Sequence, residues 1–194
     1  MSHQAPRYNG RWIGVPVPRK EDRRMLLGRG RFVADLGRPG LLHAAFVRSP
    51  YPHARLTGID AGAAVSHDGV AGVFTAASLG HPHLLAMLER DEFVPTRMPI
   101  LAWDRVRFVG EPVALVVADD AYLAEDAAED VEVDWASQPA VTGIAAARAA
   151  DAPRLHEEAD GNCLVDLLMF DDDRLAGIFA GAALTVGATF SSAR

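Results

Sequence analysis

Two groups of histidines are the first residues of this sequence whose types and spacing could do chemistry. His81 and His83 stand one residue apart, and His156 precedes Glu157 and Glu158. Imidazole and carboxylate groups bind zinc, but a zinc site needs three or four ligands of fixed geometry. No carboxylate or further histidine lies close to the first pair, and the second group lacks the other histidine of a metalloprotease helix motif. We therefore expect neither group to hold a metal.

Three further short motifs could bind a ligand or act as a nucleophile. The segment Gly28-Arg29-Gly30 lacks the third glycine and the preceding strand of a dinucleotide fingerprint, which favours a tight turn. The run 171–173 of three aspartates could ligate a hard cation, but a calcium loop needs further ligands and a glycine, which favours a charged turn before a helix. Cys163 has no basic run beside it that would favour a reactive thiolate, and a serine nucleophile elbow does not occur. These residues assemble no catalytic set.

Two stretches of like charge stand out along the chain. Residues 19–31 carry six basic and two acidic side chains, and residues 119–134 carry eight acidic side chains and no basic one. Charge runs usually form a solvated surface, and this is the reading we favour. The alternative is an electrostatic contact, either between the two stretches or with a surface of opposite charge on another chain.

The composition limits the class of protein. Of the 194 residues, 49% are hydrophobic and 23% are charged, which is typical of a globular domain. The net charge of −7 disfavours nucleic-acid binding, because proteins that neutralise phosphates normally carry a basic surplus. The single cysteine excludes an intrachain disulfide and an all-cysteine metal or iron–sulfur site, and it fits a reducing compartment. Since no signal peptide is visible either, we expect a cytoplasmic location.

An uncharged stretch near the end of the chain requires a decision about membranes. Residues 175–193 carry no charge and are almost long enough to span a bilayer. They also contain three glycines and several threonines and serines, which favours a helix over about 173–181 followed by a strand over 184–190. We therefore expect no membrane association.

The middle of the sequence predicts strands. Residues 41–48 are almost continuously apolar, as expected of a strand covered on both faces, and residues 55–60 and 70–75 are further short strands. Residues 81–99 contain three prolines and no clear period, which predicts a long, partly helical loop.

The clearest local signal runs from residue 106 to residue 135. Residues 106–109 and 113–118 predict two strands joined by a turn, the second of them central in its sheet. The aspartate pair 119–120 offers an N-cap to an amphipathic helix, and residues 131–135 alternate as a strand with one buried face does. A helix lying on one face of a mixed sheet is an α+β arrangement, which is the predicted fold class.

Several segments together closely resemble the start of the molybdenum-binding large subunit of the xanthine dehydrogenase and aldehyde oxidase family, with the carbon monoxide dehydrogenase branch looking nearest. These segments occur in the family's order and are residues 28–35, 42–54, 108–114, 124–129 and 131–135. Residues 1–18 mix proline, glycine and arginine without a period, which predicts an extended arm. The resemblance implies the family's α/β-hammerhead domain over 19–147 and the incomplete beginning of a molybdopterin-binding domain over 148–194. It also leads us to expect that the hammerhead part folds without the tail.

The family is one of oxidoreductases that hydroxylate carbon with oxygen derived from water. The resemblance implies molybdopterin, often as the cytosine dinucleotide, together with iron–sulfur and flavin subunits that transfer electrons. The family's metal-site and base motifs have no position in this sequence, so we carry over no catalytic, cofactor-binding or metal-binding residue. We expect the chain alone to be inactive and to bind no cofactor.

Two functions follow from this resemblance. The first is a split or truncated large subunit that acts as a structural part of a molybdenum hydroxylase complex, with the remaining molybdopterin-binding chain as its partner. The second is a free-standing, non-catalytic hammerhead module or gene remnant that acts, if at all, as an interaction protein. Neither function includes a nucleic acid or a membrane as partner.

Overall fold

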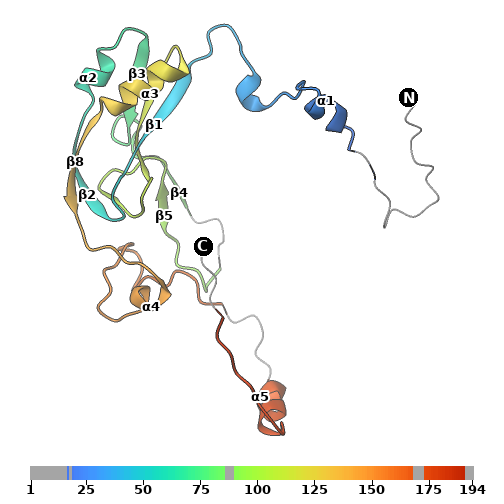
Figure 1. Cartoon of the computed structure of the whole chain (residues 1–194). Coiled ribbons are helices and arrows are strands. Elements are labelled where there is room, and N and C mark those ends of the chain that lie inside the picture. The colour runs from blue at the N-terminus through green and yellow to red at the C-terminus, as the bar shows by residue number, and fades with distance from the viewer. Residues whose placement is uncertain (1–16, 18, 86–89, 168–172, 191–194) are drawn as a thin grey trace. The chain divides into compact units, whose positions relative to one another are not determined.

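The structure, a computed structural model, describes residues 17, 19–85, 90–167 and 173–190 (Figure 1). The chain divides into two compact units, Met1–Leu42 and His43–Arg194. In the first unit, helix α1 (Asp22–Leu26) and a short 3₁₀ helix, η1 (Val33–Asp35), bury none of their residues. The sheets, the core and the candidate site belong to the second unit.

The first sheet contains the predicted central strand. Its order is β1 (His43–Arg48), β7 (Pro112–Ala118) and β3 (Val70–Thr75), and both ladders are antiparallel. Strand β7 is an apolar run rich in valine, and four of its seven residues are buried, as the sequence predicts for a strand paired on both sides.

A second sheet and a two-stranded ladder complete the strands of this unit. The second sheet has the order β6 (Arg105–Val106), β2 (Ala54–Asp60) and β8 (Glu132–Ser137). Strands β4 (His83–Leu85) and β5 (Arg97–Pro99) pair with each other in an antiparallel ladder. The alternating burial of β8 agrees with the prediction of one buried face.

Helix α3 (Ala121–Glu129) covers one face of the first sheet, where it contacts β1 and β7 (Figure 1). It begins at Asp120, whose carboxylate accepts a hydrogen bond of 2.9 Å from the Leu123 backbone N–H, as predicted for an N-cap. Its buried and partly buried side consists of Leu123, Ala124, Ala127 and Ala128, as expected of the predicted amphipathic helix, and Val131 follows it into the core. The other helices of this unit are α2 (Gly62–Val65), α4 (Ile144–Ala147) and α5 (Asp173–Ala180).

The core consists of two packed clusters, each built around a fully buried valine of β7. Val113 packs with Ala54, Ala102 and Val106. Val116 packs with Ala64, Ala127 and Val131. Val47 and Val133 contact both clusters, so the two sheets and α3 share one apolar interior.

The α+β class is confirmed, but the pairing of the strands differs from the prediction in two respects. Every ladder formed by the described residues is antiparallel, whereas we expected a mixed sheet. The strands on either side of α3, namely β7 and β8, also lie in different sheets. Periodicity reports which face of a strand is buried and carries no information about its partner or direction, which is why these two features were missed.

Two strand predictions also need correction, one in the burial of the strand and one in its end. Strand β1 alternates between partly buried and exposed residues, and Phe46 is 46% exposed, because α3 covers only one face of the sheet. The strand expected over 106–109 ends at Val106, since the following turn carries Phe108 and Val109 into solvent.

Two segments rich in proline or small residues also differ from their predicted structure. The expected partly helical loop over 81–99 contains the β4–β5 ladder, and its described residues include no helix; proline disfavours helix interiors but is tolerated at strand ends. The predicted helix near 173–181 is confirmed as α5, but residues 184–190 form no strand and are exposed. No helix within the described residues is long and apolar enough to cross a membrane.

Candidate functional site

A tight turn at Gly110 positions the polar residues of the candidate site. Gly110 has a φ of 88°, in the left-handed region that favours glycine. Its N–H donates to the Ser49 carbonyl at 2.8 Å, and its own carbonyl accepts from Arg48 Nη1 at 2.9 Å. The turn is thereby fixed to the end of β1, immediately before β7 enters the core.

Glu111 follows this turn and is only 4% exposed. Its carboxylate accepts a hydrogen bond from the Arg107 backbone N–H. Burial raises the pKa of Glu111, and the hydrogen bond to Arg107 N–H and the Arg107 charge act in the opposite direction. A carboxyl group with a raised pKa serves as an acid or base only where a reacting group can reach it. The contacts of Glu111 close its own turn, which favours a structural role.

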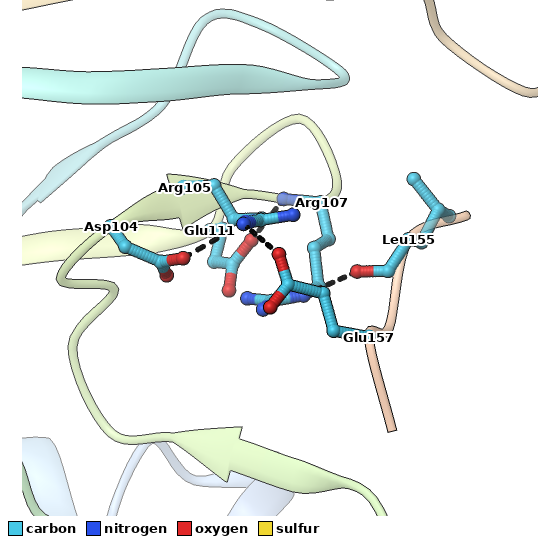
Figure 2. A network of polar contacts seen from close by, with 6 residues as sticks. All are labelled: Asp104, Arg105, Arg107, Glu111, Leu155 and Glu157. Atoms are coloured by element: carbon cyan, nitrogen blue, oxygen red, sulfur yellow. Dashed lines mark hydrogen bonds and ion pairs between the residues drawn. The ribbon is translucent and has the colours of Figure 1, made fainter. Parts of the chain in front are cut away.

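Arg105 connects this turn to a segment far along the chain, as Figure 2 shows. Its Nε donates to Asp104 at 2.9 Å, and its Nη2 donates to Glu157. The Arg105 side chain is 12% exposed, so these contacts are partly shielded from solvent. Desolvation by itself would lower the pKa of Arg105, but the two carboxylates outweigh it and hold the pKa above its ordinary value.

Arg107 makes a second connection to the same segment. Its Nε donates to the Leu155 carbonyl at 3.0 Å (Figure 2). Its Nη1 is buried and has no hydrogen-bond partner among the described residues, and the same holds for Nδ1 of His156. Burial lowers the pKa of His156, and the nearby Arg107 charge lowers it further. Two adjacent side chains thus each present an unused polar atom.

Two cavities adjoin this network. One, of about 380 Å³, is lined by Arg97, Pro99, Trp103, Asp104, Arg107, Glu157 and Glu158. The other, of about 240 Å³, is lined by Thr96, Arg97, Met98, Pro99, Arg107, Phe108, Glu111, Pro112 and His156. The first is polar and the second is mainly apolar with polar groups at its base.

The larger of these cavities does not fit the cofactor that the sequence resemblance implies. A molybdopterin dinucleotide carries phosphates, which proteins bind with cations and backbone N–H groups. Three carboxylates and two arginines line this cavity, and two of the carboxylates, Asp104 and Glu157, are paired with Arg105. The lining therefore offers no surplus of cations that would bind a phosphate, and we assign no cofactor contact to it.

The histidine pair weighed from the sequence packs against Trp103, a lining residue of the larger cavity. The rings of His81 and His83 both meet Trp103 edge to face, with ring centroids 5.5 and 6.2 Å from that of Trp103. The described residues contain no group of three side chains able to hold a metal ion. His156, from the second histidine group, joins the Arg107 network instead.

The remaining sequence candidates are not brought to this network. Gly28 has a φ of 67° and ends α1, which agrees with a tight turn. Cys163 is exposed, and its thiol donates to the Val165 carbonyl at 3.4 Å. Of the aspartate run, 171 and 172 lie outside the described residues, and Asp173 is the first residue of α5.

The acidic run 119–134 and the basic run 19–31 lie in different units of the chain. The acidic run covers the exposed side of α3 and the start of β8, where Asp130 bonds to His67 Nε2 at 2.6 Å. The basic run belongs to the other unit, where Arg19 pairs with Asp22 at 3.0 Å. A contact between the two runs stays a prediction.

Sequence reasoning missed the residues that form the network. Asp104, Arg105 and Arg107 were not singled out, and Glu111 was noted only as part of a turn. Asn162 was missed as well: its side chain accepts from Leu155 N–H at 3.1 Å and donates to the carbonyls of Pro153 at 3.0 Å and Ala147 at 3.3 Å. No local pattern in the sequence could show that Arg105 and Arg107 contact Glu157 and Leu155, because these partners lie far along the chain.

The chain is similar to a known protein family and to several characterised proteins. Residues 27–139 match the family described as aldehyde oxidase and xanthine dehydrogenase, a/b hammerhead domain. The chain is 46% identical over 124 residues to the nicotine 6-hydroxylase large subunit of Paenarthrobacter nicotinovorans, a match that covers 63% of this chain and 15% of that protein. It is 38% identical over 144 residues to the carbon monoxide dehydrogenase large chain of Hydrogenophaga pseudoflava, covering 73% of this chain and 17% of that one.

A solved structure gives a similar result. Quinoline 2-oxidoreductase from Pseudomonas putida 86 superposes with a TM-score of 0.77 and 42% sequence identity, over 88% of this chain and 22% of the enzyme chain. The chain thus spans less than a quarter of the length of each of these three proteins.

Proposed function

Because the chain belongs to the aldehyde oxidase and xanthine dehydrogenase family through its a/b hammerhead domain, we propose that it supplies the hammerhead part of the large subunit of a molybdenum hydroxylase-type oxidoreductase complex. In this function the chain is a structural component without its own molybdenum site, and it is inactive alone. Its partners are the remaining molybdopterin-binding polypeptide and the iron–sulfur and flavin subunits of such a complex, in the cytoplasm.

The superposition on quinoline 2-oxidoreductase is the observation that carries this proposal, since it extends over 88% of the chain. The core is built from strands and α3 within residues 43–137, so the hammerhead can serve as a preformed scaffold. The Arg105 and Arg107 contacts then hold residues 155–157 against it. Residues of this chain therefore hold residues 155–157 in position and fix the turn at Gly110.

Molybdopterin, in its cytosine dinucleotide form, supplies the redox chemistry of the complete enzyme. In such systems the protein contributes binding, orientation and electrostatics. We assign to this chain no catalytic residue, no cofactor-binding residue and no metal ligand.

The second candidate is a free-standing, non-catalytic hammerhead module or gene remnant that acts, if at all, as an interaction protein. The exposed apolar residues of α5, among them Ile178 and Phe179, favour an interaction role in either case. The two candidates differ in whether the chain functions within a large subunit.

A chimera distinguishes them. The segment of quinoline 2-oxidoreductase that superposes on this chain is replaced by this chain, and the product is expressed in a host that makes the cofactor. A soluble chimera that contains stoichiometric molybdenum and oxidises quinoline supports the large-subunit function. An insoluble or molybdenum-free chimera contradicts it, as does stoichiometric molybdenum on the isolated chain.

A further inference from the structure

Four exposed apolar residues either line the 240 Å³ cavity beside the Gly110 turn or directly adjoin its lining residues in the sequence. Met98 and Phe108 line this cavity, and Ile100 and Val109 lie next to its lining residues in the sequence. All four are between 48% and 63% exposed. We call these four residues and the cavity beneath them the docking surface. Methionine and aromatic residues are enriched at protein interfaces, and exposed apolar clusters mark partner sites.

Two of the residues that line this cavity are incompletely bonded. Arg107 and His156 both belong to the lining, and Arg107 Nη1 and His156 Nδ1 are buried without a hydrogen-bond partner among the described residues. Native structures seldom leave such atoms unpaired, because an unpaired buried donor lowers stability. Arg107 is held in place by its Nε contact to Leu155, so its second nitrogen is oriented before any ligand arrives.

The unused Arg107 nitrogen, rather than a net charge, selects the chemistry of what binds. Arg97 and Arg107 line both cavities, so the carboxylates of the larger cavity offset their charge. Glu111 already accepts from the Arg107 backbone N–H. The unused Arg107 nitrogen is a donor, so the missing group is a hydrogen-bond acceptor. The cavity is smaller than the roughly 300 to 1,000 Å³ of small-molecule sites, and it suits a single side chain or a short piece of backbone.

We propose that the docking surface receives the remainder of the large-subunit polypeptide, which places a carboxylate or carbonyl oxygen at Arg107 Nη1 and apolar side chains against Met98 and Phe108. This inference rests on the proposed function and names the contact surface for it. The occupant is chosen because each related large subunit is more than four times as long as the part matched by this chain, so most of that polypeptide lies outside the matched segment. Arginine is also among the residues enriched in interface hot spots.

Thiol labelling tests the surface directly. In a Cys163→Ser background, Phe108→Cys is compared with Tyr122→Cys, which lies on α3 and is 81% exposed. Both are treated with N-ethylmaleimide, in the isolated chain and in the chimera, and the labelled peptides are quantified by mass spectrometry. We expect equal labelling in the isolated chain, and labelling of Phe108→Cys slower by about tenfold or more in the chimera, because a docked surface reacts only when it opens.

The outcomes separate the two proposals. A molybdenum-loaded chimera in which Phe108→Cys still reacts as fast as Tyr122→Cys overturns the docking surface and leaves the proposed function intact. A chimera that fails to assemble overturns the proposed function, and the docking surface falls with it. Concentration-dependent protection of Phe108→Cys in the isolated chain would show that a second copy covers the surface, which also overturns the inference.

A second variant tests the polar anchor. Arg107→Lys keeps the charge but cannot present two oriented nitrogens. In the isolated chain this substitution removes the contact with the Leu155 carbonyl, and in the chimera it also removes the proposed contact of Arg107 Nη1 with the rest of the large subunit. Arg107→Lys should therefore lower the melting temperature of the chimera by more than that of the isolated chain. Equal losses in both proteins would show that Arg107 has no partner outside this chain.

Discussion

Arg107 Nε donates a hydrogen bond of 3.0 Å to the carbonyl of Leu155, a residue 48 positions further along the chain. A second connection nearby is the isolated bridge between Phe93 and Val165, beside which Val94 N–H donates to Leu164 at 2.9 Å. These contacts join residues 155–166 to the hammerhead part. They place residues 155–166 with the hammerhead part, whereas the domain boundary at 147 stays a prediction from sequence.

Truncation at two positions tests this boundary. A chain that ends at residue 167 should melt within a few degrees of the full chain and contain more monomer, because the exposed apolar residues of α5 are gone. A chain that ends at 147 should be less stable, because Arg105 keeps only Asp104, Arg107 loses the Leu155 carbonyl, and an unpaired buried donor costs about 1–3 kcal/mol. Melting curves and size-exclusion chromatography compare the two. Identical melting of both truncated chains would place residues 148–167 outside the folded unit.

An aspartate in the middle of β7 should prevent folding where the side chain faces the core. It should be tolerated better where the side chain faces the other side of the sheet. Val116 is fully buried against Ala64 and Ala127, so Val116→Asp places an unpaired carboxylate in the core at a cost of several kcal/mol. Leu115 pairs with Phe46 and Phe74 in register and is only partly buried, so Leu115→Asp should cost less. Urea unfolding measures both, and equal destabilisation would mean that the outer face of this sheet is covered as well.

The N-cap of α3 should have a measurable effect. Asp120→Ala removes the acceptor of the Leu123 N–H and should lower stability by about 1 kcal/mol. Asp120→Ser is the matched control, because a serine hydroxyl also caps a helix and should retain most of the stability. The cap would be unimportant if the alanine and serine variants had the same free energy of unfolding.

Glu111 predicts a pH dependence of stability. Burial raises its pKa above 4.5 in the folded chain, so the folded state binds the proton more tightly than the unfolded state does. The contribution of Glu111 to stability is therefore fully present below pH 4.5 and is lost as the pH rises through the folded pKa. Glu111→Gln can still accept from Arg107 N–H but does not titrate.

The stability of Glu111→Gln relative to the parent should consequently increase as the pH rises from below 4.5 towards neutrality. Thermal melts of both proteins across this range measure the difference, and Glu129→Gln on the exposed side of α3 is the control. A parent-to-variant difference that stays constant with pH would contradict a raised pKa.

The sequence by itself determined the elements that depend on neighbouring residues. The cap at Asp120, the apolar face of α3 and the alternation in β8 follow from side chains within one or two turns of each other, so their patterns are visible without a structure. The family was also recognisable, because its motifs keep their order along the chain. The strand expected over 184–190 failed because strand formation needs a partner, which the described residues do not provide.

Only the tertiary structure decided the features that join distant residues. The antiparallel pairing of β1 with β7 determines which side of Phe46 is covered, and the Arg105–Glu157 and Arg107–Leu155 contacts determine where the candidate site lies. No local pattern encodes these contacts, since each depends on where the whole chain places two segments. The unpartnered nitrogens of Arg107 and His156 became visible for the same reason: a buried atom without a partner exists only once the fold has surrounded it.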